Sequence, residues 1–435
     1  MRAGATLAAT ASSPGCATAG AQVLGANDRL NVAVMGVRSR GRALIHGFHK
    51  MGARITHIVD VDLRTLDEVS GEMVAKSLPS PKLERDVRRV LEDRHVDAVV
   101  IAAPDHWHAP AAIMALAAGK HVYLEKPSSH NPREDELLVA AQQKYGRVVQ
   151  MGNQQRSAPE SIELITRVSE GEIGNIYQAK TWYANNRGSI GNGTMVPAPN
   201  WLDWELWQGP APRRPYQDNL HPYNWHWFWH WGTGETCNNA AHELDMARWA
   251  MGLGDPVRVT AEGARHFHTH DDWEMYDTLD LNLHYDGGRS ISWSGHSCIN
   301  APTFGRTRGT QLLGTKGWAI VDRAGYEIYD LDGQLVDGRK RIETRANNSA
   351  DLVGADELTD LHIANFIDTV RGTAGRQASP IEEGAISTRM CHLGNIAYRS
   401  DGAIALDPGT GRPTTSNALA LWGREYHEGW APEGA

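Results

Sequence analysis

The first third of the chain alternates short apolar runs with segments of helical periodicity. An apolar run at 30–35 ends at Gly36, and apolar side chains then recur at helical spacing over 40–51, which predicts a strand, a turn and a helix. Further β-rich runs, separated by helical patterns at 109–118 and 133–144, lie at 54–59, 98–102, 121–124 and 148–151. Because strands that alternate with helices pair in parallel, we predict an α/β domain with a doubly wound parallel sheet.

The rest of the chain predicts a second unit that is richer in strands. Six β-rich runs with turn residues between them lie at 175–184, 257–265, 278–284, 290–295, 309–313 and 318–321. Helical patterns at 358–370 and 381–400 close the chain, and we expect these helices to pack back on the body. A chain of 435 residues is too long for one ordinary core, so two domains are predicted.

Polar side chains follow two consecutive strands of the predicted parallel sheet. The run at 98–102 is followed by Ala103, Pro104, Asp105 and, after two further residues, His108; the next strand ends in Glu125, Lys126 and Pro127. Ligands bind at this edge of an open parallel sheet. A lysine here is placed for proton transfer to or from a substrate hydroxyl or carbonyl.

The first turn resembles a dinucleotide-binding turn without its middle glycine. It reads Gly36, Val37, Arg38, Ser39, Arg40 and Gly41. Arg38 stands where a glycine normally lets the backbone approach a pyrophosphate, so an ordinary βα turn is the alternative. Asp60 strengthens the nucleotide hypothesis, because it ends the second strand at the position from which a carboxylate accepts hydrogen bonds from the adenosine ribose.

The charge of Asp60 also bears on cofactor choice. A carboxylate would repel a 2'-phosphate, so we predict NAD in preference to NADP. Arg38, Arg40 and Arg64 could offset that repulsion.

Tryptophan is concentrated in one segment. Seven of the fifteen tryptophans lie between Trp201 and Trp231, with His221, Tyr223, His226 and His230 among them. Packing of a long insertion is one interpretation; a carbohydrate pocket is the other, because aromatic faces stack on sugar rings. His226 and His230 have the helical spacing of metal ligands, but no third ligand is placed, and we assign no metal site.

A third cluster lies on the helical run 235–251. Asn238, His242, Asp245 and Trp249 stand at i, i+4, i+7 and i+11, which places them on one face of a regular helix. His242 is therefore a candidate acid or base, although a structural histidine at a domain interface has the same pattern.

These motifs together resemble the oxidoreductase family named for glucose-fructose oxidoreductase, inositol dehydrogenase and MocA. The resemblance rests on the glycine turn, Asp60, the Ala-Pro-Asp-x-x-His sequence ending at His108, Glu-Lys-Pro at 125–127, and Gly234-x7-His242-x2-Asp245. It runs from Asn27 to the C-terminus, and residues 415–430 are similar to the closing segment of a secreted, tryptophan-rich branch. It implies a Rossmann domain at 29–152 and, at 153–435, an α/β domain with a large, open, mostly antiparallel sheet.

The resemblance also implies roles for individual residues. An aspartate commonly stands four residues before the histidine, where this chain has Asn238, so Lys126 and His242 must carry the acid–base work unless Asp245 helps. The residues expected at the NAD site are Gly36, Val37, Arg38, Ser39, Arg40, Gly41, Asp60, Ala103, Pro104, Asp105, His108, Glu125, Lys126, Asn153 and Gln154. Those expected at a carbohydrate substrate are Tyr183, His226, Trp229 and Trp231.

Three functions remain open at this point. The first is an NAD-dependent oxidoreductase acting on a secondary hydroxyl or ketone of a sugar, glycoside or polyol. The second is an NAD-dependent glycosidase that works by transient oxidation and elimination, and the third is a non-catalytic nucleotide-binding protein. Retention of both Lys126 and His242 argues against the third.

Composition limits the partners. The net charge is −9 with both signs interspersed, so nucleic acid is not expected, and no apolar run is long enough to span a bilayer. The four cysteines show neither a disulfide framework nor a zinc knuckle.

Residues 1–28 are interpreted as a leader or a disordered tail. With the resemblance, we expect a periplasmic or exported protein, and otherwise a cytoplasmic one. We also expect a homo-oligomer formed through the open sheet.

Overall fold

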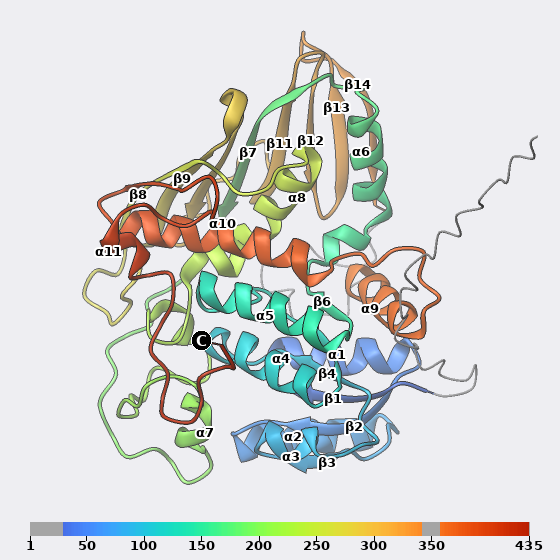
Figure 1. Cartoon of the computed structure of the whole chain (residues 1–435), viewed down its shortest axis with the longest axis vertical. Coiled ribbons are helices and arrows are strands. Elements are labelled where there is room, and N and C mark those ends of the chain that lie inside the picture. The colour runs from blue at the N-terminus through green and yellow to red at the C-terminus, as the bar shows by residue number, and fades with distance from the viewer. Residues whose placement is uncertain (1–28, 342–356, 435) are drawn as a thin grey trace, which may run out of the picture.

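The computed structural model describes residues 29–341 and 357–434, which form two sheets stacked one above the other (Figure 1). The interpretation of residues 1–28 as a leader or tail lies outside the described residues. The lower sheet is parallel, with strand order β3-β2-β1-β4-β5-β6. Its strands are β1 Asn31–Met35, β2 Arg54–Val59, β3 Lys82–Glu84, β4 Ala98–Ile101, β5 His121–Leu124 and β6 Val149–Met151.

Helices cover both faces of this parallel sheet. They are α1 Ser39–Lys50, α2 Leu63–Ala75, α3 Val87–Leu91, α4 His108–Ala117 and α5 Pro132–Tyr145. The strands are apolar throughout their length, as in β4, whose four residues are all buried, because both faces are covered. The predicted doubly wound sheet is confirmed; the pattern did not predict β3, α2 or α3.

The upper sheet has nine strands in the order β14-β13-β12-β11-β7-β10-β9-β8-β15. Only β7 and β10 pair in parallel, and the other neighbours are antiparallel, as expected. The strands are β7 Ile176–Ala184, β8 Arg258–Ala264, β9 Thr278–His284, β10 Ser290–His296, β11 Arg308–Gly314, β12 Trp318–Asp322, β13 Gly325–Tyr329, β14 Leu335–Lys340 and β15 Ala403–Ala405. The alternation of buried and half-buried residues in β10 shows one covered and one more open face.

Helices between the sheets hold the two domains together. α6 Pro159–Ser169 and α8 Ala241–Met251 pack on the upper sheet, and α10 Ile381–Arg399 crosses between the sheets (Figure 1). Ser128 after β5 donates a hydrogen bond to Thr388 of α10 (2.9 Å). α9 Glu357–Arg371 packs on α1 so closely that a side chain at Gly47 would meet Ile363. The C-terminal helices therefore fix the parallel sheet against the upper domain.

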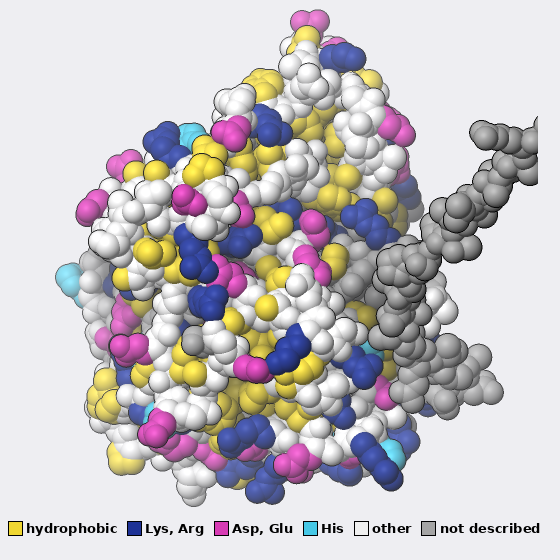
Figure 2. All heavy atoms as spheres, in the orientation of Figure 1, with side chains coloured by type: hydrophobic (Ala, Val, Ile, Leu, Met, Phe, Trp, Pro, Cys, Tyr) yellow, Lys and Arg dark blue, Asp and Glu magenta, His cyan; other side chains and the backbone are white. Residues whose placement is uncertain are grey.

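The surface carries charges of both signs. On the face shown in Figure 2, lysine and arginine side chains are interspersed with aspartate and glutamate. Over residues 29–341 and 357–434, no helix is long and apolar enough to cross a membrane.

Candidate cofactor and substrate site

A large cavity lies along the carboxyl edge of the parallel sheet, and two distant parts of the sequence form its walls. One wall consists of the ends of β1, β2, β4 and β5; the other comes from the tryptophan-rich segment, residues 201–231. The predicted cofactor residues at this cavity are Gly36, Arg38, Ser39, Arg40, Asp60, Ala103, Pro104, Asp105, His108, Glu125 and Lys126. Residues that join them from the other wall or the upper domain include Trp207, His221, Tyr223, Trp225, His226 and Asn238.

The glycine-rich turn brings the start of α1 to the cavity. Gly36 has a φ of +77°, and a Cβ there would lie 2.6 Å from the carbonyl oxygen of Ala102. A Cβ at Gly41 would lie 1.8 Å from the oxygen of Gly36, so both outer positions require glycine. The first turn of α1 has no acidic residue. Backbone N–H groups at the start of a helix suit a pyrophosphate.

Asp60 ties the turn to the second strand. Its carboxylate accepts hydrogen bonds from the backbone N–H of Val37 (3.0 Å) and of Asp62 (3.1 Å). Each carboxylate oxygen has a second lone pair, and the side chain lines the cavity. Burial raises the pKa of Asp60 to about 6. Asp60 is therefore placed to accept ribose hydroxyls, and it is ionised at neutral pH.

Two of the three nearby arginines are already paired with carboxylates. Arg40 donates to Glu125 (Nε to Oε1, 2.8 Å), while Arg64 pairs with Asp62 (2.9 Å) and lies over the ring of Trp201. Arg38 remains at the cavity wall. These pairings reduce the positive charge available to a 2'-phosphate.

Lys126 joins the two domains inside the cavity. Its Nζ donates to the backbone oxygen of Asn238 (2.7 Å) and to the Oδ1 of Asn238 (2.9 Å). Burial lowers the pKa of Lys126, although the carboxylates of Asp105 and Glu125 oppose that effect. A lowered pKa makes the neutral, proton-accepting form of a lysine more accessible.

The predicted regular helix at 235–251 is wrong in its first part. Residues Thr236–Ala240 form a π-helical turn, η4, and α8 begins only at Ala241. The wider turn changes which side chains share a face. Asn238 consequently reaches Lys126, whereas His242 is buried and is not among the residues that line the cavity.

The surroundings of His242 and Asp245 differ from those expected of a proton relay. Burial, together with Arg323 and Arg308, holds the pKa of His242 well below its ordinary value, and its Nε2 makes no hydrogen bond within the described part of the chain. Asp245 receives two hydrogen bonds from Arg156, each 2.8 Å, and one from Ser387 (2.6 Å). Burial would raise the pKa of Asp245, but Arg156 keeps it below its usual range. These contacts make Asp245 part of a buried ion pair.

Asn153 and Gln154 lie behind the cavity wall. Gln154 donates to Glu125 (3.1 Å), and Asn153 is buried without a hydrogen bond from its amide to any described residue. Gln154 therefore contacts the expected cofactor site only through Glu125.

The aromatic residues divide between core and cavity. Trp231 is only 1% exposed and packs against Trp207, Trp204 and His106, and Trp229 borders a separate small cavity. Neither ring is among the residues that line the main cavity, and Trp231 belongs instead to a core that the dense tryptophans build. Tyr183 is likewise buried away from the cavity, and its hydroxyl accepts hydrogen bonds from Asn185 and Arg187.

His226 does line the main cavity. Its Nδ1 lies 2.6 Å from the Tyr223 carbonyl oxygen, to which it donates, and its ring stacks on Trp225. Burial lowers the pKa of His226 to about 3, so its Nε2 is a neutral acceptor. Over the described ranges, no group of three His, Cys, Asp or Glu side chains could hold a metal ion.

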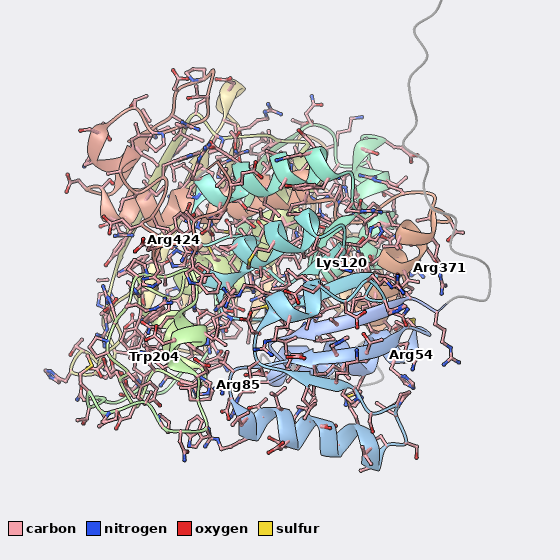
Figure 3. The ribbon with its side chains drawn as sticks, turned by 60° about the horizontal axis from the view of Figure 1, so that its bottom comes forward. Arg54, Arg85, Lys120, Trp204, Arg371 and Arg424 are labelled. Carbon is pink, nitrogen blue, oxygen red and sulfur yellow. The ribbon has the colours of Figure 1, made fainter. Side chains whose placement is uncertain are left out.

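The tryptophan-rich segment contacts the domain of the parallel sheet at several points. The N–H of Leu63 donates to the oxygen of Trp201 (2.9 Å), and the Trp107 indole donates to the oxygen of Trp207 (2.9 Å). An antiparallel bridge joins Asp62 and Leu202. Figure 3 shows Trp204 of α7 (Trp204–Gln208) beside the loop that carries Arg85, which pairs with Asp203. The segment thereby covers the cavity at its Asp60 end.

Glu235 is a site residue that sequence reasoning missed. It is 1% exposed, accepts a hydrogen bond from the Asn238 amide (3.2 Å), and pairs with Arg187 (3.1 Å). It thus orients the amide that contacts Lys126. The available signal was an acid three residues before Asn238, a spacing that brings two side chains together on one helix face.

Known proteins agree with this architecture. A model of the oxidoreductase family with an NAD-binding Rossmann fold matches residues 30–153, and one of the GFO/IDH/MocA C-terminal domain matches residues 207–320. An uncharacterized oxidoreductase, YrbE of Bacillus subtilis (strain 168), is 24% identical over 275 residues, 62% of this chain and 69% of that protein. A glycosyl hydrolase family 109 protein of Shewanella pealeana is 27% identical over 161 residues, 36% of this chain and about a third, 35%, of the relative.

A solved structure described as levoglucosan dehydrogenase in complex with NADH and levoglucosan has the same fold. Its TM-score is 0.66 at 17% identity, covering 87% of this chain and 99% of that one. Both matched models belong to one family, and together they span more than half of the chain. The protein is a member of the Gfo/Idh/MocA oxidoreductase family, with its NAD-binding Rossmann domain and its C-terminal domain.

Proposed function

We propose that this protein is an NAD(H)-dependent oxidoreductase that acts on a secondary hydroxyl, or the corresponding ketone, of a sugar, glycoside or polyol. The observation that carries the proposal is the contact of Lys126 with Asn238 inside the cavity that Asp60 and the glycine turn also line. Nucleotide-binding groups and a proton-transfer group thus share one space.

The residues present fit NAD. The turn at 36–41 would hold the pyrophosphate and Asp60 the adenosine ribose. When bound, NAD supplies the acceptor or donor of the hydride. Asp105 and Glu125 would line its reactive end, close to Lys126.

Lys126 is the proposed proton carrier. In its neutral form Nζ takes the proton from the substrate hydroxyl as the alcohol is oxidised; in its charged form it returns that proton to the ketone oxygen. Asn238 cannot take a proton, so its role is to hold Nζ in place. His226, neutral and on the same wall, replaces His242 as the imidazole proposed to accept a substrate hydroxyl.

The substrate class is inferred from the cavity and from relatives. Trp107, Trp207, Tyr223 and Trp225 line it beside polar groups, a combination that suits sugar rings. A structural neighbour is described as a levoglucosan dehydrogenase with its sugar bound.

Residues 201–231, which cover the cavity at its Asp60 end, support a second candidate function, an NAD-recycling glycosidase. A cofactor held beneath residues 201–231 would remain bound between turnovers, as oxidation followed by re-reduction of the same substrate requires. A glycosyl hydrolase family 109 relative matches about a third of the chain.

One experiment separates these functions. Ligand released from denatured protein is identified by mass spectrometry, and the intact protein is then given sugars, polyols and aryl glycosides. Accumulation of reduced cofactor supports the dehydrogenase, and aglycone release without net reduction supports the glycosidase. Neither activity, or equal activity in Lys126→Met, would overturn the proposal. Lys180→Met is the matched control, because Lys180 is exposed on β7 and makes no side-chain hydrogen bond or ion pair with the described residues.

A further inference from the structure

A second, smaller cavity lies between the start of α5, the end of α10 and the tryptophan-rich segment. Gly232 and Thr233 form one wall, and Thr233 turns its hydroxyl the other way, to Asp105 of the main cavity. The side chains that matter for this cavity are His130, Asn131, Trp229, Asn395 and Arg399. Thr233 therefore lines the second cavity and contacts a residue that lines the main one.

Asn131 presents an unused donor to this cavity. Its Oδ1 caps α5 by accepting a hydrogen bond from the N–H of Glu134 (3.1 Å), and the residue is only 5% exposed. Its Nδ2 is buried and makes no hydrogen bond within residues 29–341 and 357–434. A buried amide donor without a partner costs about 1–3 kcal/mol, so a ligand that accepts this hydrogen bond gains affinity.

His130 adds a second unused group. Both ring nitrogens are buried and make no hydrogen bond to other described residues. Burial and the charge of Arg424 hold its pKa well below the ordinary value, so the ring is neutral, with one nitrogen a donor. Arg424, which is labelled in Figure 3, is already paired through its guanidinium with Glu134 (2.7 Å).

Arg399 supplies positive charge at the rim. Its guanidinium lies over the ring of Trp229, 4.7 Å from the centroid, and makes neither a hydrogen bond nor an ion pair in the part of the chain that is described. The carboxylate of Glu274 is near enough to influence Arg399, but it accepts a hydrogen bond from the backbone of Trp229 (2.9 Å). The planar guanidinium thus keeps its donors for a ligand.

The unused donors share one preference. An amide N–H, an imidazole N–H and a guanidinium all donate to oxygen, and the guanidinium favours a negative one. We propose that this second cavity binds a small oxyanion, either inorganic phosphate or the carboxylate of a small acid, through Asn131, His130 and Arg399. The site is independent of the cofactor site and of the proposed oxidoreductase activity.

Calorimetry on the full chain at constant ionic strength tests the proposal, with inorganic phosphate and acetate as separate probes. Arg399→Met removes the charge from an exposed position. Asn131→Asp keeps the oxygen that caps α5 and replaces the free donor by a negative oxygen. Arg371→Met, at the exposed end of α9 (Figure 3), is the matched control.

We expect one of the two anions to bind, and the stronger probe identifies the source. Each cavity variant should weaken that binding at least about tenfold, since a hydrogen bond to a charged group is worth about 1.5–3 kcal/mol, while the control stays unchanged. These variants leave the glycine turn intact, so an anion held there would bind all of them equally. Equal affinity in wild type and Arg399→Met, or no binding of either anion, would overturn the proposal. Circular dichroism verifies that Asn131→Asp is folded; if it is not, Arg399→Met decides alone.

Discussion

Asn238→Asp should raise the pKa of Lys126. The amide Oδ1 lies 2.9 Å from the Lys126 Nζ, so the substitution places a carboxylate against the ammonium without a change in size. A charged lysine is favoured by such a partner, and the neutral form becomes rarer at every pH. For alcohol oxidation, which uses the neutral amine, the rising limb of the pH–rate profile moves to higher pH and activity at neutral pH falls.

The geometry bounds the size of this effect. Two unit charges 2.9 Å apart attract by about 6 kcal/mol at an effective dielectric constant of about 20, which corresponds to about four pH units as an upper limit. The neighbouring carboxylate of Glu235, 3.2 Å from the Asn238 amide, reduces the gain. An opposite charge close to a titrating group typically moves its pKa by about one to three pH units, and we expect a rise in that range.

Lysine titration by NMR of isotopically dimethylated protein measures this rise without a substrate, and Lys126→Met identifies the signal. Asn417→Asp adds the same charge at an exposed position in α11 (Ser416–Leu419) and should leave the signal unchanged. A Lys126 pKa that is the same in Asn238→Asp as in wild type would show that the two side chains are not in contact in solution.

Three further predictions concern the cofactor, the buried ion pair of Arg156 and Asp245, and the aromatic segment. NAD affinity measured by calorimetry should fall as the pH drops through about 6, where Asp60 becomes protonated. Asp60→Asn should weaken NAD binding by about 1–3 kcal/mol at neutral pH and abolish this pH dependence. Unchanged NAD affinity in this variant would show that Asp60 does not bind the cofactor. Arg156→Met removes the guanidinium that pairs with the buried carboxylate of Asp245 and should lower the free energy of unfolding in urea by about 3–5 kcal/mol. A loss below about 1 kcal/mol would contradict a buried ion pair. Trp231→Ala should lower the free energy of unfolding by about 3–5 kcal/mol in the same assay, as the loss of a core ring does. Tyr223 is half-exposed at the cavity, so Tyr223→Ala should affect ligand affinity more than stability. The reverse pattern would refute the division into core and cavity.

The parallel sheet could be predicted because its signals are local. Apolar runs, the glycine at position 36 and the acid at position 60 each lie within one strand–turn unit, and sheet topology brings their ends to one edge. Asp60, Asp105 and Lys126 reach the cavity for that reason.

The sequence-based predictions failed where distant side chains meet, where a helix is irregular, and where one residue type serves both core and cavity. The ion pair of Arg156 and Asp245 joins residues 89 positions apart, and no spacing rule reveals it. The π-helical turn at Thr236–Ala240 removed His242 from the face assumed for it, because periodicity presupposes a regular helix. Tryptophan density likewise did not separate Trp231, which fills the core, from Trp207, which also borders the cavity.

The central claim is that Lys126 transfers the proton while NAD occupies the cavity it shares with Asp60. Its most direct test is a single-turnover measurement of cofactor reduction in Lys126→Met, alongside NAD binding and circular dichroism of the same preparation. We predict that the fold and the NAD affinity are retained, while the rate of reduction falls about a hundredfold or more, the usual scale for a lost acid–base group. Reduction at the wild-type rate with NAD bound would contradict the account.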